Sequence, residues 1–398
     1  MAERGDRDPG SAGGGKPINS PKPTLLVSGM IAGDPHQGGA AWAVLQYVLG
    51  FRRLGHEVVL VEPIQRERLH PATGEFFRRV VGDFGLERSA ALLLVGTRET
   101  AGLTYAELVA VGRRAEVFLN ISGMLTDPEI TDRIPLRVYL DLDPAFVQLW
   151  HAQGIDMRFA GHSHFVTVGQ AIGHSDCPVP TCGLPWIPTL QPVVLDRWPA
   201  AEPMVADVDA PLTTVANWRG YGSIEHEGVF YGQKAHSWRP LMRLPTRTRE
   251  RFLLALSIHP DERKDLAALA ANGWELVDPV EAAGTPARYQ AFLRGSKAEL
   301  GIAKSGYVNS RCGWFSDRSV CYLASGRPVI AQETGFSRFL PTGAGLFAFE
   351  TAEDVLAAIE EMNGDYPRHA RAARALAEEF FDSDKVLGSL LQRLGTTS

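Results

Sequence analysis

The sequence predicts two α/β domains, each built around a parallel β-sheet. Three observations support this fold class. The chain has 398 residues, and a single hydrophobic core stops growing at roughly 250 residues. Short apolar runs alternate with helical patterns in both halves of the chain. A proline-rich segment lies between the halves and interrupts this alternation.

The N-terminal half, which we place at residues 23–176, opens with a β-α-β unit. Its first elements are a strand, a glycine-rich loop, a helix and a second strand, at residues 24–27, 28–39, 40–54 and 56–62. Gly55 follows the helix, where a C-cap glycine is common. Parallel strands need a crossover helix between them, so this opening predicts a parallel sheet.

The alternation continues to the end of this half. The further segments are two helices, 74–84 and 104–114, and four strands, 91–95, 116–121, 137–141 and 165–168, the last of which ends the half. Asp141 and Asp143 lie where the strand at 137–141 ends. Open α/β sheets bind ligands beyond the carboxyl ends of their strands, so these carboxylates are candidates for a catalytic base or a metal site. The structural alternative is a turn, because Asp143-Pro144 is also a common helix start.

Residues 177–211 contain eight prolines and are expected to link the domains, because proline breaks helices and central strands. Residues 212–380 repeat the α/β pattern as a second domain. Its expected segments are 212–217, 252–258, 274–277, 289–294, 298–302, 317–324, 328–330, 346–349, 352–362 and 366–380. Residues 381–398 are expected to form a C-terminal helix and tail.

Composition excludes several classes of protein. Hydrophobic residues make up 45% and charged residues 22% of the chain, which excludes a wholly disordered or fibrous protein. The formal net charge is −6, and no run of Lys and Arg is long enough to neutralise a series of phosphates. Duplex nucleic acid is therefore not an expected partner.

The cysteines and the termini indicate a cytoplasmic protein. The four cysteines lack the spacing of a zinc knuckle, so we expect reduced thiols, with a disulfide as the alternative. Residues 1–22 have no apolar stretch typical of a secretory signal and are expected to form a disordered tail. Apolar runs such as residues 90–95 are far shorter than the roughly 20 residues that cross a bilayer. No transmembrane segment is therefore expected.

Residues 303–336 carry a resemblance to a known family. A strand, a polar loop, a helix ending in Leu-Ala-Ser-Gly-Arg-Pro-Val-Ile and a Thr-Gly loop follow one another there. This segment resembles the donor-binding core of GT-B glycosyltransferases, in which two Rossmann-like domains face each other across a cleft. The resemblance implies transfer of a sugar from a nucleotide-sugar donor, held by the C-terminal half, to a small-molecule, lipid or glycan acceptor. It also implies that no metal or other cofactor is needed.

Several residues of this segment suit a diphosphate. Ser316 is a candidate N-cap for the helix at 317–324, and the free N–H groups of that helix end and Arg318 favour an anion. Lys304 lies just past a strand and could reach the same phosphates. Asp317 could accept hydrogen bonds from ribose or sugar hydroxyls. The structural alternative is that these residues only cap the helix, favour its dipole and form surface ion pairs.

Four further residues are candidates for the donor site. Arg219 follows the first strand of the second domain, and its guanidinium matches phosphate oxygens. Glu333, Thr334 and Gly335 could contact the donor through a side chain or backbone amides. The aromatic run around Lys234 is expected to serve packing, so we leave it out of the site.

The chain departs from the retaining members of the family, which carry a spaced pair of glutamates beside the helix at 317–324. Gly313 and Cys321 occupy those two places. The stereochemical outcome of the reaction is therefore left open, as are two rival functions. One is a nucleotide-sugar epimerase of the same fold, and the other is a binding protein without catalysis.

The glycine-rich loop at 28–39 supplies the last candidates. The resemblance places His36 and Gly38-Gly39 of this loop near the reacting sugar. A neutral His36 imidazole could accept the proton of the acceptor hydroxyl in an inverting displacement. Asp143 is the other candidate base, and a solvated loop histidine is the structural alternative.

Overall fold

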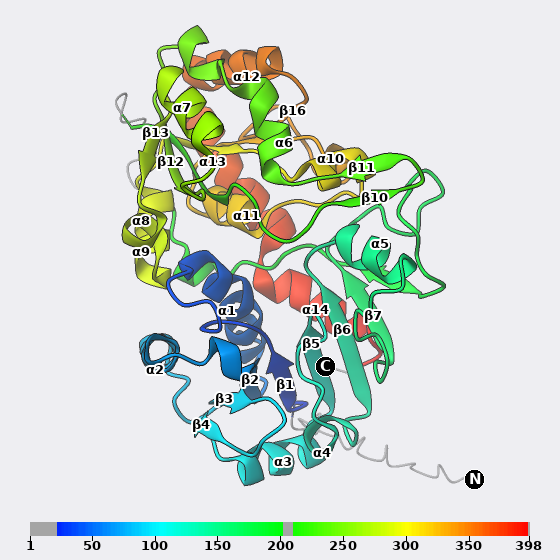
Figure 1. The fold of residues 1–398 in the computed structure, drawn as a ribbon. Coiled ribbons are helices and arrows are strands. Elements are labelled where there is room, and N and C mark those ends of the chain that lie inside the picture. Colours follow the sequence, from blue (N-terminus) through cyan, green and yellow to red (C-terminus); the bar gives the residue numbers. More distant parts are fainter. Residues whose placement is uncertain (1–21, 202–209, 397–398) are drawn as a thin grey trace, which may run out of the picture.

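The structure, a computed structural model, describes residues 22–201 and 210–396. Apart from Lys22, the predicted tail at residues 1–22 lies outside the described residues. Two α/β domains lie one above the other in Figure 1, the N-terminal domain below and the C-terminal domain above. The predicted fold class is confirmed, because each domain contains its own sheet of mainly parallel strands.

The N-terminal sheet has eight strands in the order β4-β3-β2-β1-β5-β6-β7-β8. Their bounds are β1 Leu25–Ser28, β2 Val58–Ile64, β3 Ala90–Leu94, β4 Thr100–Gly102, β5 Val117–Ile121, β6 Leu136–Asp141, β7 His164–Thr167 and β8 Trp186–Pro188. Every neighbouring pair is parallel except β3 and β4. Strands β1, β2, β3 and β5 are buried along their whole length, as expected for a parallel sheet covered on both faces.

The helices of this domain are α1 Gly38–Arg53, α2 Pro71–Asp83, α3 Tyr105–Arg114, α4 Pro128–Thr131 and α5 Phe146–Ala152, with short 3₁₀ turns at Arg66–Arg68 and Leu195–Arg197. Three of them, α2, α3 and α4, begin at a capping side chain or a proline. Helix α3, for example, begins with a capping box. The Thr104 hydroxyl accepts from the Glu107 N–H at 3.3 Å, and the Glu107 carboxylate accepts from the Thr104 N–H at 2.7 Å.

The C-terminal sheet has six parallel strands in the order β13-β12-β9-β14-β15-β16. Their bounds are β9 Leu212–Asn217, β12 Phe252–Ser257, β13 Glu275–Val277, β14 Ala298–Gly301, β15 Val329–Gln332 and β16 Leu346–Phe349. The strands that follow β9 in the chain, β12 and β13, extend the sheet on one side of β9, whereas β14, β15 and β16 extend it on the other. The order of the strands therefore reverses between β9 and β14. Ligands of open α/β sheets bind beyond the carboxyl ends of the strands at such a reversal, so the loops after β9 and β14 are the first place to look for a site.

The chain after β9 also forms a hairpin and further helices, the last of which leaves this domain. The hairpin and helices are β10 Ile224–His226, β11 Val229–Tyr231, α6 Lys234–Trp238, α7 Arg263–Ala271, α8 Pro279–Ala283, α9 Pro286–Arg294, α10 Ser305–Ser310, α11 Asp317–Ala324, α12 Ala352–Gly364, α13 Tyr366–Leu376 and α14 Ser383–Arg393. Short 3₁₀ turns lie at Arg239–Leu241, Leu244–Arg247 and Phe336–Arg338, and a π-helical turn at Ala377–Phe381 follows α13. The hairpin was not among the predicted segments.

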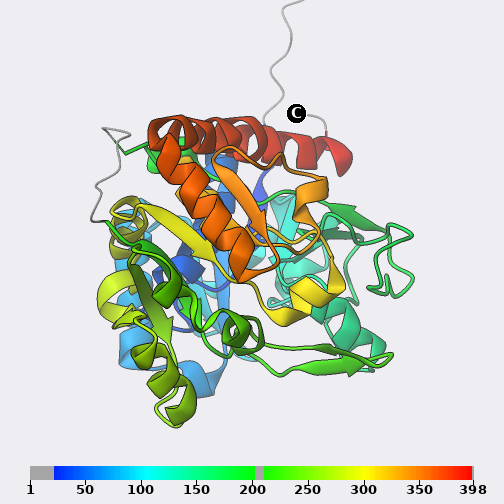
Figure 2. The ribbon, with the colours of Figure 1, turned by 90° about the horizontal axis from the view of Figure 1, so that it is seen from above.

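Two parts of the chain cross the expected division into domains. Strand β8 comes from the proline-rich segment and extends the N-terminal sheet beside β7, so the prediction that residues 165–168 form the last strand of this half is wrong. Its position at the edge of the sheet explains why proline is tolerated there. Helix α14, red in Figures 1 and 2, carries the chain back from the C-terminal domain and packs against α1.

The cysteines and the helices bear on two further expectations. All four cysteines are free, so the alternative of a disulfide among them is excluded. Within residues 22–201 and 210–396, each helix is too short or too polar to cross a membrane.

Candidate active site

The loops after β6 and β14 meet between the two domains. Lys304, which follows β14, places its Nζ 3.1 Å from Oδ1 of Asp143, which follows β6. The hydroxyls of Tyr221 and Tyr307 also donate to this Oδ1, the latter at 2.5 Å. The Lys304 ammonium lies 3.7 Å from the centre of the Tyr221 ring. The structure therefore brings together two predicted site residues, and we call Asp143, Lys304, Tyr221 and Tyr307 the Asp143 cluster.

Asp141 supports the loop that carries Asp143. The Asp141 side chain is fully buried and accepts hydrogen bonds from the Asp143 N–H, Gln148 Nε2 and Thr167 Oγ1, each at 2.8 Å. Burial raises the pKa of Asp141 to about 7. Of the two carboxylates proposed from the sequence, only Asp143 contacts the other domain, and Asp141 has a structural role.

The environment of Asp143 favours its ionised form. Burial alone would raise the pKa of Asp143, but the charge of Lys304 and the hydrogen bonds from Tyr221, Tyr307 and Lys304 outweigh burial and hold that pKa below its ordinary value. All three donors contact Oδ1, and 37% of the side chain stays exposed. A carboxylate that is stabilised in this way is a weak proton acceptor while these donors remain in place.

Lys234 is a candidate that the sequence interpretation assigned to packing. It is the first residue of α6, it is 7% exposed, and its Nζ donates to the backbone carbonyl of Ile302. No carboxylate of the described residues lies within ion-pair distance of this ammonium. Burial, together with the positive charges of Arg318 and Lys304, lowers the pKa of Lys234 well below its ordinary value. A buried cation without an anion is costly, so Lys234 is a candidate for binding an anion.

Helix α11 starts beside these cations. The predicted N-cap is present, because the Ser316 hydroxyl accepts from the Arg318 N–H at 3.2 Å. The Arg318 side chain points inward, with Nε 2.6 Å from Oε1 of the fully buried Glu299 and a hydrogen bond of 3.0 Å to the Val215 carbonyl. Burial raises the pKa of Asp317, and the charge of Arg318 opposes this effect. Arg318 is therefore paired inside the protein and is not a surface ion pair.

The remaining predicted donor residues have partners within the C-terminal domain. Arg219 forms an ion pair with Glu262, and its side chain is 41% exposed. The Glu333 carboxylate accepts from the Gly335 N–H at 2.5 Å, so these two residues order their own loop. Thr334 donates its hydroxyl to the Trp314 carbonyl and thereby ties this loop to the segment before α11.

The glycine-rich loop makes different contacts from those expected near a ligand. Gly38 lies so close to the C-terminal domain that a Cβ on it would be 2.3 Å from the Thr285 carbonyl oxygen, and one on Gly39 would be 2.8 Å from the Tyr289 ring. His36 is exposed, packs edge-on against Phe76, and lines a hollow of about 400 Å³ between α2 and helices α8 and α9. No residue of the Asp143 cluster lines this hollow, so the two candidate bases do not share a site.

Glu62 holds the middle of the same loop. This buried carboxylate at the end of β2 accepts from the backbone N–H groups of Ala32 and Gly33, at 2.9 and 2.5 Å. Burial raises the pKa of Glu62 to about 7. The loop that joins β1 to α1 is therefore held in its middle by Glu62 and at its end by the close approach of Gly38 to Thr285.

The close approach of Gly38 leads to a test of the domain interface. We expect Gly38→Ala to lower the free energy of unfolding by about 1–3 kcal/mol, because the added methyl group overpacks the contact with Thr285. Urea denaturation measures this change. Gly74→Ala is the matched control, because a methyl group on this helical glycine would meet only the end of a flexible arginine. An unchanged stability in Gly38→Ala would contradict the close contact between the domains.

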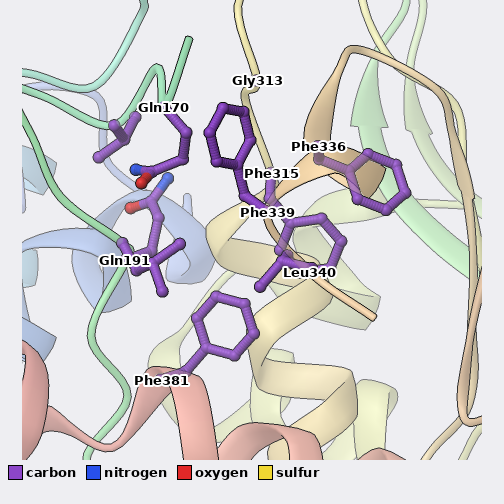
Figure 3. A pocket seen from close by; sticks show the side chains of 10 residues that line it. Gln170, Gln191, Gly313, Phe315, Phe336, Phe339, Leu340 and Phe381 are labelled. Carbon is purple, nitrogen blue, oxygen red and sulfur yellow. The ribbon is translucent and has the colours of Figure 1, made fainter. Parts of the chain in front are cut away.

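A second, apolar hollow lies where the family pattern has its first glutamate. Gly313, Phe315, Phe339 and Phe381 line it together with the amide side chains of Gln170 and Gln191 (Figure 3). Its volume is about 10 Å³, which is enough for one water molecule at most. Gly313 has a φ of 75°, and a Cβ there would be 2.9 Å from the Ala171 nitrogen of the other domain. A glutamate at this position would not fit between the domains as they are placed.

Among the described residues, His, Cys, Asp and Glu side chains form no group of three or more that could hold a metal ion. The expectation that no metal takes part remains a prediction.

Solved structures with the same architecture include an alpha-glucosyltransferase and Anabaena HepE. The alpha-glucosyltransferase, solved with UDP-glucose and DNA containing an abasic site, has a TM-score of 0.60 and 11% identity over 94% of this chain and 99% of that chain. HepE, solved with UDP and glucose, has a TM-score of 0.57 and 10% identity over 94% and 99%. No family model and no curated protein matches the sequence. The likeness shows that the chain has the GT-B fold, with two Rossmann-like domains facing each other across a cleft.

Proposed function

We propose that this protein is a glycosyltransferase that binds a nucleotide-sugar donor in the cleft, with the diphosphate beside Lys234. The single observation that carries the proposal is the buried Lys234 ammonium, which has only a backbone carbonyl as partner. Two phosphates would supply the missing negative charge. The positive charges of Lys304 and Arg318 act on Lys234, and Arg318 belongs to the first turn of α11, whose N-terminus also favours an anion.

Uridine diphosphate sugars are the first donors to test. The solved neighbours were crystallised with UDP or UDP-glucose, and we extend this preference to the present chain as part of the proposal. The diphosphate site would act by positioning the donor and by stabilising the departing phosphate. Ser316, Asp317, Arg219 and the loop at 333–335 stay secondary candidates for donor contacts.

The acceptor is proposed to be a small molecule, a lipid or a glycan. One neighbour was solved with DNA, but the present sequence has a formal net charge of −6 and no long basic run. Such a surface is a poor match for duplex phosphates. The free cysteines fit a reducing compartment, so we propose that the reaction takes place in the cytoplasm.

Calorimetric titration of the full chain with UDP, GDP and TDP, followed by incubation with the corresponding sugar nucleotides, tests the proposal. We expect micromolar binding of one nucleotide and slow hydrolysis or transfer of its sugar, detected by NMR. Isomerisation of the donor would favour an epimerase, and binding without turnover would favour a protein that has lost catalysis. Failure of every nucleotide to bind would overturn the donor assignment.

A further inference from the structure

Lys304 has one anionic partner in the structure, Asp143, and the proposed donor diphosphate would be a second. In the structure its ammonium is held by Asp143 across the domain boundary, at 3.1 Å, and by the hydroxyls of Tyr221 and Tyr307. Lys234 lies nearby, because its amine donates to the carbonyl of Ile302, two residues before Lys304, and the charge of Lys304 acts on it. A diphosphate neutralising Lys234 would therefore lie within reach of Lys304, which has a long and flexible side chain.

We propose that the donor diphosphate competes with Asp143 for Lys304, and that Asp143, once released, accepts a hydrogen bond from the acceptor hydroxyl. This inference rests on the proposed function. It gives Lys304 two alternative partners and makes Asp143 the residue that meets the acceptor after the donor has bound.

The geometry of Asp143 fits this role. Its Oδ1 takes the contacts from Lys304, Tyr221 and Tyr307, while more than a third of the side chain remains exposed. Asp141 fixes the backbone of the loop, so the carboxylate stays in place when Lys304 leaves. The two tyrosines come from the C-terminal domain, Tyr221 from the segment after β9 and Tyr307 from α10, and they are positioning residues for the carboxylate.

Competition for one cation makes a specific prediction about affinity. Removing any carboxylate near a phosphate site reduces repulsion of the ligand, and this general effect does not depend on Lys304. In addition, Asp143→Asn frees Lys304 for the phosphates, and we expect UDP to bind about three- to tenfold more tightly. Lys304→Met should weaken UDP binding by about tenfold or more, because the cation itself is lost.

The experiment is a double-mutant cycle by calorimetric titration with UDP. It compares the wild-type chain with Asp143→Asn, Lys304→Met and the double variant. If the two residues compete as proposed, Asp143→Asn tightens UDP binding much more when Lys304 is present than in the Lys304→Met background. Asp132→Asn, an exposed aspartate elsewhere in the same domain, controls for the loss of one negative charge and should leave UDP affinity unchanged.

Weaker or unchanged UDP binding by Asp143→Asn, or equal tightening in both backgrounds, would overturn the inference. Asp143→Ala, measured beside it with an unfolding curve for each variant, guards against a folding defect in a single replacement. Absence of nucleotide binding to the wild-type chain would instead count against the proposed function. The two failures are therefore distinguishable.

Discussion

Lys234→Met is expected to weaken UDP binding by about 50-fold and at the same time to make the free protein more stable. Hydrogen bonds to charged groups contribute about 1.5–3 kcal/mol, which corresponds to roughly 10- to 150-fold in affinity. In the free protein the same ammonium is buried with one carbonyl as its partner. Methionine fills a similar volume without a charge, so the free energy of unfolding should rise by about 1–2 kcal/mol.

The gain in stability should depend on pH in a defined direction. The pKa of Lys234 is lower in the folded than in the unfolded protein. Between the folded pKa and the ordinary value of about 10.4, the unfolded chain binds more protons, so Lys234 makes stability rise with pH in this window. The methionine variant lacks this contribution. Its advantage over the wild type should therefore be largest below the folded pKa and disappear above the unfolded pKa.

Two measurements separate this prediction from a general effect of removing a lysine. Calorimetric titration with UDP gives the affinity, and urea denaturation at several pH values gives the stability. Lys264→Met, at an exposed position of α7, is the matched control and should change neither. A variant of Lys234 that loses stability, or that binds UDP as the wild type does, would contradict the assignment of Lys234 to the diphosphate.

The local elements of the fold were predictable because each depends on neighbours in the sequence. Helix α11 was predicted at the residues where it lies, since Ser316 caps its start. The strands at 212–217 and 346–349 were also predicted with their observed bounds, the first because it is rich in β-branched residues and the second because it is a compact apolar run. By contrast, β8 and the hairpin of β10 and β11 were missed. The first is three residues long and contains a proline, and the second consists of two three-residue strands.

The candidate site was predictable only in parts. Lys304 and Asp143 were each proposed from their position after a strand, but their contact depends on how two domains are placed, which local patterns do not encode. Lys234 was assigned to packing because it lies among aromatic residues. That neighbourhood was the available signal, since a lysine within an aromatic run is a candidate for burial. Gly38 was placed near the reacting sugar, whereas in the structure it lies against the Thr285 backbone.

Arg318→Met is expected to cause the largest loss of stability, about 3–5 kcal/mol in the free energy of unfolding. The change would leave the carboxylate of Glu299, which is fully buried, without its cation. Oε2 of Glu299 already has no hydrogen-bond partner, so no other group is in place to compensate. Breaking a buried pair by removing one partner costs far more than removing both. The double variant Arg318→Met with Glu299→Leu should therefore recover most of the loss in urea denaturation.

The double variant is also the proper background in which to test Arg318 as a donor ligand. A lower affinity of the single variant for UDP would mix lost contacts with partial unfolding. In the stable double variant, a direct contact between Arg318 and the phosphates predicts UDP binding weakened by about tenfold or more. Loss of Glu299 removes a nearby negative charge and works in the opposite direction, so the measured loss is a lower bound. If the double variant is folded and binds UDP as the wild type does, Arg318 is a structural partner of Glu299, and Lys234 and Lys304 alone supply the cationic side chains of the site.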